Sequence, residues 1–233
     1  TMLVPIDSID DPRLSAYRDL TTKNLTRHSG LFIAEGEKVA ERLIDSRFDV
    51  VSLLAEPLLA AKYEPQLGPN TPVFVVSPDQ MVSIAGFHFH RGILACGHRQ
   101  PVTNIDSLDI ATAEQARTVV LCPNVQDPTN LGSIIRTAAA LGCLAVILGR
   151  SSADPFSRRV LRVSMGAALH IPIIESADLA ADITALKTAG FEIVASVLDP
   201  KATPLSQFNR QQRPLALLLG SEGHGLAPQW LDV

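Results

Sequence analysis

Short, fully apolar runs recur through the second half of the chain, and stretches with helical periodicity separate them. The runs predict strands at Val119–Cys122, Ala145–Leu148, Ile171–Ile174, Ile193–Ser196 and Leu215–Leu219. The intervening periodicity predicts helices at Leu131–Leu141 (capped by Thr129 or Asn130), Ser157–Ala168 and Leu179–Ala189. Apolar strands alternating with helices are typical of a mostly parallel sheet that is covered on both faces. We therefore expect an α/β domain at residues 117–233.

The first hundred residues predict a smaller α/β domain at residues 1–99. Strands are expected at Leu31–Ala34, Val50–Leu54, Val73–Val76 and Gly92–Ala95. Helices are expected at Glu37–Ile44 and from Ser77, an N-cap residue followed by Pro78. Residues 100–116 are polar and lack a sustained apolar period, so we interpret them as a linker.

Composition narrows the class of protein. With 46% hydrophobic residues and a net charge of −4, the chain has material for a core and lacks the signature of disorder. The slight acidic excess is not typical of a nucleic-acid-binding protein, although an acidic protein can carry a local basic patch that binds nucleic acid. Three cysteines predict small buried thiols in a reducing compartment rather than a disulfide framework. We find no signal-peptide pattern and no apolar run long enough for a membrane span, so we expect a cytoplasmic protein.

Two strand ends carry the chemistry-bearing residues, since ligands of open α/β sheets bind beyond the carboxyl ends of strands. After Cys122, a polar loop leads into a helix where Gly132 and Arg136 share a face. After Leu219, a loop holds Gly220, Glu222 and two further glycines, Gly223 and Gly225. This loop can bring its backbone close to a ligand. From spacing alone, an ordinary surface arginine and a plain tight turn remain open alternatives.

These two segments resemble the motifs of the SpoU/TrmH family of RNA methyltransferases. Asn130–Gly142 is similar to the first motif, with its Asn-x-Gly-x-x-x-Arg-Thr-Ala core, and Leu217–Leu226 is similar to the second. Gly30–Val39 and Arg91–Ala95 resemble, more softly, the ends of the family's substrate-binding extension. The resemblance thus covers nearly the whole chain, and the two motifs in this order are specific.

The resemblance implies transfer of a methyl group from S-adenosylmethionine to a ribose 2′-hydroxyl of structured RNA, tRNA or rRNA. It also implies an N-terminal L7Ae-like RNA-binding domain, a C-terminal SPOUT-type domain, and a homodimer formed through that C-terminal domain. The family's third motif, a Ser-Leu-Asn segment that threads a trefoil knot, is not found before Val233. We therefore expect the knot only if the natural chain continues past residue 233, and weak or no cofactor binding without that motif.

The resemblance assigns roles residue by residue. Asn130 and Arg136 would face the reacting ribose, and Glu222 would shape the catalytic site. The expected cofactor-binding residues, which include loop backbone and a strand end beside the adenosine, are Ser196, Leu219, Gly220 and Gly223. Because arginine stays protonated, we interpret Arg136 as stabilising the developing alkoxide and holding a substrate phosphate, which can itself accept the proton.

Two basic clusters are candidate RNA contacts, with a solvated surface as the plain alternative. One is a predicted helix segment with Arg158, Arg159 and Arg162. The other, near the N-terminus, comprises Arg13, Arg18, Lys23 and Arg27, of which we select Arg27.

The sequence admits three further interpretations. His88, His90, Cys96 and His98 suggest a zinc site, but alternation with Phe87 and Phe89 favours a half-buried strand, so no metal is expected. A non-catalytic RNA-binding protein that lost the third motif is the alternative function. A nucleotide-binding oxidoreductase is disfavoured, because the glycines run G-x-x-G-x-G rather than G-x-G-x-x-G.

Overall fold

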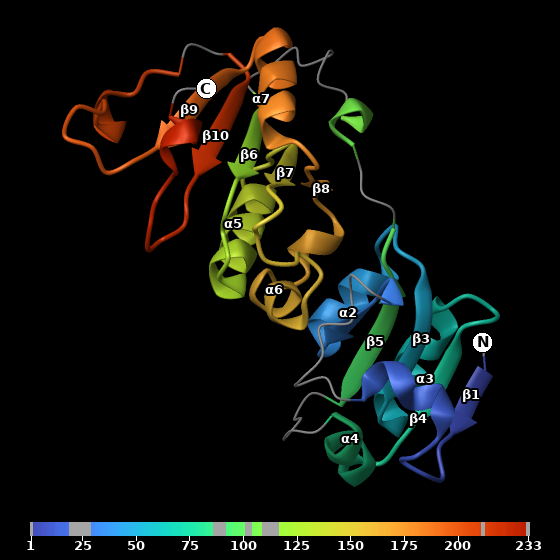
Figure 1. Cartoon of the computed structure of the whole chain (residues 1–233). Coiled ribbons are helices and arrows are strands. Elements are labelled where there is room, and N and C mark those ends of the chain that lie inside the picture. Colours follow the sequence, from blue (N-terminus) through green and yellow to red (C-terminus); the bar gives the residue numbers. More distant parts are fainter. Residues whose placement is uncertain are drawn as a thin grey trace. The chain divides into compact units, whose positions relative to one another are not determined.

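The structure is a computed structural model that describes residues 2–18, 29–85, 92–100, 104–108, 117–210 and 213–231. The chain forms two compact units (Figure 1). The first consists of Thr1–Pro101 together with Phe156–His170, and the second of Val102–Pro155 together with Ile171–Val233. Both are α/β, as the sequence predicted.

The first unit contains a five-stranded mixed sheet with the order β1-β4-β3-β5-β2. The strands are β1 (Met2–Pro5), β2 (Leu31–Glu35), β3 (Val50–Ala55), β4 (Pro72–Val75) and β5 (Ile93–His98). The pairs β1·β4 and β3·β4 are parallel, whereas β5 is antiparallel to both β3 and β2. Sequence reasoning missed β1, a four-residue edge strand without a repeating apolar pattern.

Helices α2 (Glu37–Ile44), α3 (Pro57–Tyr63) and α4 (Pro78–Ala85) complete the first unit, with 3-10 turns at Pro12–Tyr17 and Glu64–Gln66. The expected start at Ser77 is confirmed by a reciprocal cap. Ser77 N–H donates to Gln80 Oε1 at 2.8 Å, and Gln80 N–H donates to Ser77 Oγ at 3.2 Å. Within the core, the buried hydroxyls of Tyr17 and Ser52 lie 2.7 Å apart and share a hydrogen bond.

The second unit contains a five-stranded, wholly parallel sheet with the order β8-β7-β6-β10-β9. The strands are β6 (Thr118–Cys122), β7 (Ala145–Leu148), β8 (Ile173–Glu175), β9 (Glu192–Ser196) and β10 (Leu215–Leu219). The chain winds outward in one direction from β6 to β8 and then crosses over to β9 and β10. The neighbouring strands β6 and β10 therefore flank the topological switch point, where open parallel sheets bind their ligands.

Two helices pack on opposite faces of this sheet. Helix α7 (Leu179–Thr188) buries Leu179, Ile183 and Leu186 in one core with the strand residues Val119, Leu121, Ala145, Ile147, Ala216 and Leu218. The alternate strand residues Val120 and Leu217 point to the other face, beside α5 (Pro128–Ala140). The remaining 3-10 turns are Ile105–Ser107, Ala167–Leu169, Leu205–Gln207 and Pro228–Trp230.

Several boundaries differ from those that the sequence predicted. Helix α5 begins at Pro128 and is capped by Asp127, not by Thr129 or Asn130. Strand β8 starts only after Pro172, whose ring cannot donate to a sheet ladder. The helix expected at Ser157–Ala168 is split into α6 (Arg158–Val163) and a 3-10 turn, because Met165 and Gly166 adopt positive φ angles of 54° and 78°.

Two findings concern the expected domain limits. Residues Phe156–His170 belong to the first compact unit, although the sequence placed them in the 117–233 domain. Within the expected linker, Ile105 and Leu108 are buried in the core of the second unit. No helix among the residues that the structure describes is long and apolar enough to cross a membrane.

Candidate functional site

Hydrogen bonds connect the loops after β6 and β7 next to the switch point. The carbonyl of Cys122 accepts hydrogen bonds from Gly149 N–H at 2.9 Å and from the buried hydroxyl of Ser152 at 2.8 Å. The oxygen of that hydroxyl in turn accepts the N–H of Val125 at 3.2 Å. These bonds hold the chain between β6 and α5 in a fixed conformation.

Asp127 sets the start of α5. One of its carboxylate oxygens accepts the N–H of Thr129 at 2.6 Å and the N–H of Asn130 at 3.1 Å. Pro128, with its φ already suited to a helix, occupies the first turn. Asn130 therefore lies in the first turn of the helix. Its backbone N–H, which has no acceptor within the helix, is satisfied by the cap.

The loop after β10 closes on itself. Ser221 and Gly225 exchange two backbone hydrogen bonds, of 3.1 and 2.8 Å, so Glu222, Gly223 and His224 form its tip. A Cβ atom at Gly220 would lie 2.3 Å from the carbonyl carbon of Gly225, which leaves no room for a side chain. Gly225 has a φ of +63°, a conformation that favours glycine.

Two cavities open beside this tip. The first, here called the larger loop cavity, has a volume of about 430 Å³ and is lined by Val125, Gln126, Asp127, Asn130, Ser133, Ile134, Gly220, Ser221, Glu222, Gly223 and His224. The second, the smaller loop cavity, has a volume of about 240 Å³ and is lined by Pro123, Asn124, Ser151, Gly220, His224, Gly225, Leu226, Ala227, Gln229 and Trp230. Both lie at the carboxyl ends of β6 and β10.

The structure brings most of the expected site residues together. Asn130, Glu222, Gly220 and Gly223 all line the larger loop cavity. Arg136 is exposed on α5 and is not among the residues that line either loop cavity.

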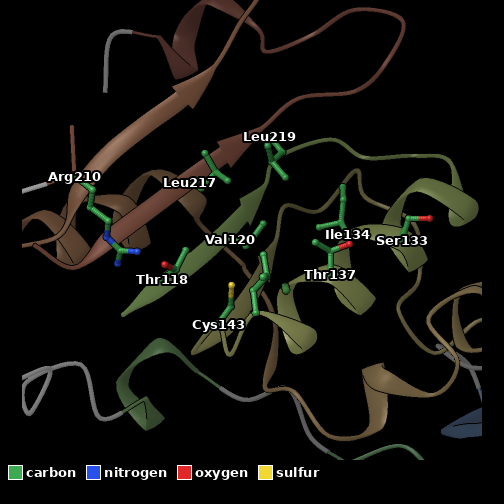
Figure 2. Close-up of a pocket in the computed structure, with 11 residues that line it drawn as sticks. Thr118, Val120, Ser133, Ile134, Thr137, Cys143, Arg210, Leu217 and Leu219 are labelled. Atoms are coloured by element: carbon green, nitrogen blue, oxygen red, sulfur yellow. The ribbon is translucent and has the colours of Figure 1, made fainter. Parts of the chain in front are cut away.

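The other two expected cofactor residues are strand ends. Ser196, exposed at the end of β9, is the register partner of Leu219 at the end of β10. Leu219 lines a third, mostly apolar groove of about 540 Å³ between α5 and the outer face of β6 and β10. Figure 2 shows Leu217, Leu219 and Val120 along its strand wall, with Arg210 at one end.

The expected RNA-binding arginines have different surroundings. Arg158 donates to the carboxylate of Glu35 at 2.7 Å and Arg162 donates to it at 3.2 Å, and only 5% of that carboxylate side chain is exposed. Arg159 is exposed. Arg27 lies outside the described residues.

Two of the other N-terminal cations, Arg13 and Arg18, bind groups close to them in the sequence. Arg13 forms an ion pair with Asp11 at 2.5 Å, and its hydrogen bonds lower the pKa of that carboxyl to about 2. Arg18 donates to the carbonyls of Ile9 and Asp11. Lys23 lies outside the described part of the chain.

The histidine and cysteine residues weighed as a zinc site are only partly described. Cys96 is a buried free thiol whose pKa burial raises to about 12, and His98 is exposed at the end of β5. His88 and His90 lie outside the described residues. Where the structure describes the chain, no group of three potential metal ligands is found.

Three residues of the site escaped sequence reasoning. Asp127 could have been found, because an aspartate before a proline is a helix-start signal. Ser221 and His224 stand between the glycines of the loop, and nothing in their spacing predicts a role.

Comparison with known proteins identifies the family to which this arrangement belongs. Residues 117–233 match the model of the SpoU rRNA Methylase family. The chain belongs to this family. Its membership confirms the expected SPOUT-type α/β fold, the class of RNA methyltransferases and S-adenosylmethionine as cofactor, and it does not favour the non-catalytic alternative.

Relatives extend the match over both units. A Mycobacterium bovis protein named as an uncharacterized tRNA/rRNA methyltransferase is 38% identical over 231 residues, covering 96% of this chain and 79% of the relative. The Bacillus subtilis 23S rRNA guanosine 2′-O-methyltransferase RlmP is 29% identical, covering 97% and 86%. A Sinorhizobium meliloti rRNA methyltransferase solved with bound AdoMet is 26% identical with a TM-score of 0.82, covering 99% and 85%.

Proposed function

We propose that this enzyme methylates a ribose 2′-hydroxyl of structured RNA. The observation that supports this most is the larger loop cavity, where Asn130 from the first motif and Glu222 from the second line one space at the switch point. Relatives with a named substrate, RlmP of Bacillus subtilis and RlmB of Acinetobacter baylyi, are 23S rRNA guanosine 2′-O-methyltransferases. Ribosomal RNA is therefore the first substrate to test, and tRNA the second.

The residues present fit S-adenosylmethionine. The larger loop cavity falls within the size range of small-molecule sites. In its lining, the Ser221 hydroxyl is buried and has no hydrogen-bond partner in the part of the chain that the structure describes. A buried hydroxyl without a partner is costly, so a ligand that bonds to it gains affinity. We propose that Gly220 and Gly223 bind the cofactor through their backbone, with Leu219 and Ser196 at the neighbouring strand ends.

The cofactor supplies a methyl group on a positively charged sulfur. The chain's own residues must orient the ribose, because positioning provides much of the rate of an in-line displacement. Asn130 and Glu222 are proposed to hold the ribose beside the loop. Arg136 is proposed to stabilise the developing alkoxide and to grip a phosphate through its planar fork.

A homodimer formed through the C-terminal domain would complete the site. Arg136 is exposed and does not line the loop cavities of its own chain. The apolar groove beside α5, at whose end Leu141 is 76% exposed, is a surface of the kind that oligomers cover. We propose that the arginine of one protomer acts in the site of its partner. Light scattering should then give a dimer at micromolar concentration, and a clean monomer would contradict it.

RNA binding is proposed to involve residues 1–99 of the first unit, together with the arginines of α6 in the same unit. Arg158, Arg159, Arg162 and Arg27 are the proposed phosphate contacts, and two of them, Arg158 and Arg162, also bind Glu35. Since its substrates would be tRNA or rRNA, the enzyme is proposed to act in the cytoplasm.

The test is transfer of a radiolabelled methyl group from S-adenosylmethionine to RNA by the full-length protein. The RNA is then degraded with alkali, which cannot cleave next to a 2′-O-methyl ribose. The proposal predicts label in alkali-resistant dinucleotides. Label released as mononucleotides modified on the base would contradict it, as would the absence of transfer to rRNA and tRNA.

A further inference from the structure

Three aromatic rings pack together in the first unit, beside α2 and α6. Phe32 belongs to β2, Phe48 follows α2 and Phe156 precedes α6, and all three are buried. In each pair the ring centres lie 5.4 to 5.6 Å apart, so every ring contacts the other two. Gly97 of β5 makes room for them, because a Cβ atom there would lie 2.4 Å from the ring of Phe32. Segments far apart in the sequence thus build one fixed aromatic cluster.

Two arginines lie over this aromatic cluster. The guanidinium carbon of Arg47 is 5.4 Å from the ring centre of Phe48, and that of Arg99 is 5.0 Å from the ring centre of Phe156. Contacts of this length attract a cation to the face of the ring. The side chain of Gln100 connects the two segments, because it donates to the carbonyl of Arg47 at 2.7 Å. The two guanidinium groups are therefore held on one support.

The charge of Arg47 is not neutralised by a contact, unlike that of another stacked arginine. Arg13 also lies over an aromatic ring, but it binds the carboxylate of Asp11 at 2.5 Å. The exposed side chain of Arg47 forms no ion pair and no hydrogen bond in the part of the chain that the structure describes. Asp45 and Asp49 are exposed two positions away on either side, and exposed charges that do not touch interact weakly through water. Arg47 therefore keeps its donors for a ligand.

The surroundings of the aromatic cluster are basic. Helix α6 carries three arginines and no acidic residue. The end of this helix lies against α2, because Arg42, which is exposed, donates to the carbonyl of Met165. These cations stand in a chain whose net charge is −4. A local concentration of arginines on an acidic protein is the electrostatic feature of a surface that binds nucleic acid.

We propose that Arg47 and Arg99 bind phosphates of the substrate RNA, an inference that rests on the proposed function. The ring beneath each guanidinium covers one of its faces and leaves the N–H groups along its edge to donate. This edge matches two oxygens of a phosphate. Because phosphates repeat along the RNA, two guanidinium groups on one support can contact its backbone at two points. Such contacts position the RNA on the first unit and do not read its sequence.

The first measurement is the affinity of the full-length protein, with S-adenosylhomocysteine present, for end-labelled bulk tRNA and for rRNA fragments between 50 and 300 mM KCl. Arg47→Gln and Arg99→Gln should each weaken binding about tenfold at the lowest salt concentration. Each should also reduce the slope of log affinity against log salt by about one. The loss should be the same for tRNA and rRNA, because phosphates are common to both.

Arg13→Gln is the matched control. It removes the same charge from an arginine that also lies over a ring, but whose fork is occupied by Asp11. Its affinity for RNA should stay within about twofold of that of the unaltered protein. Arg47→Lys keeps the charge and loses the planar fork, so it should keep the salt slope and lose about threefold in affinity. Circular dichroism should show that every variant folds, since both arginines of the proposed surface lie outside the buried core.

The outcomes separate this surface from the proposed function. If Arg47→Gln and Arg99→Gln bound RNA like the unaltered protein, the surface would fall and the proposed function would stand. An equal loss in Arg13→Gln would overturn it as well, because net charge alone would then set the affinity. A loss confined to one RNA would overturn the assignment to phosphates. If RNA binding depended on both arginines but no ribose were methylated, the surface would stand and the proposed function would fall.

Discussion

The carboxylate of Asp127 accepts the backbone N–H of Asn130 at 3.1 Å, and so the cap of α5 and the first residue of the Asn-x-Gly-x-x-x-Arg pattern are one structural unit. Because Asn130 lines the larger loop cavity, the stability of this helix end and the geometry of the site are linked.

Asp127→Ala should therefore cost both stability and activity. Loss of an aspartate cap typically costs about 1 kcal/mol, and fraying of the first turn displaces Asn130. Asp178 caps α7 through the same pattern, with Ala180 and Ala181 N–H at 3.1 Å, and serves as the matched control. Urea unfolding should show similar losses for both alanine variants, whereas methyl transfer should fall only for Asp127→Ala. Equal activity of the two variants would disconnect the cap from the site.

Glu35→Gln should destabilise the first unit. The carboxylate is nearly buried and binds Arg158 and Arg162, so its neutralisation removes the negative charge that faces two partly buried cations. With 20% and 34% of the arginine side chains exposed, we expect a loss of about 1–3 kcal/mol. Glu37→Gln breaks the exposed pair with Lys62 and should change the free energy of unfolding little. Comparable effects of the two substitutions in urea would contradict the burial argument.

Alkaline pH should weaken the fold through Cys122. Burial raises the pKa of this thiol from 9.0 to about 12, so the folded state keeps its proton where the unfolded chain has lost it. Its contribution to stability is complete below pH 9 and is lost as pH rises from 9 toward 12. Between pH 7.5 and 10, the unaltered protein should lose about 1 kcal/mol more than Cys122→Ala. Groups common to both proteins cancel in this difference, and identical pH slopes would refute the prediction.

Substitutions of Arg136 distinguish its proposed catalytic role from that of an ordinary surface arginine. Lysine keeps the charge and loses the bidentate fork, so Arg136→Lys and Arg136→Ala should both lose about 10²–10³ in single-turnover rate. Cofactor affinity should change little, because the loop at Gly220 is proposed to bind through its backbone. An ordinary surface arginine predicts almost no loss. Lost cofactor binding in calorimetry would instead move Arg136 into the cofactor site.

The sequence predicted the second sheet well, because strands such as Val119–Cys122 and Leu215–Leu219 are apolar throughout, as burial on both faces requires. It missed β1, since a short edge strand needs only partial burial. The sequence also predicted one continuous helix across Met165 and Gly166, where the structure has a break. The positive φ angles of these two residues are set by packing, which the apolar period does not report.

The candidate site, like the fold, was only partly predictable from the sequence. Asn130, Glu222 and Gly220 could be named from the resemblance to the family's motifs, and the structure brings them to one cavity. The pairing of Arg158 and Arg162 with Glu35 could not, because it joins residues more than 120 positions apart. Nor could the position of His224, which depends on the closure of the loop from Ser221 to Gly225.

The most direct test of the central claim is a map of ribose 2′-O-methylation across rRNA and tRNA in the source strain and in a strain that lacks this gene. The account predicts that one 2′-O-methyl group disappears with the gene and returns when the gene is restored, but does not return with the Arg136→Ala variant. An unchanged ribose methylation map, or the loss of a methyl group from a base instead, would contradict it.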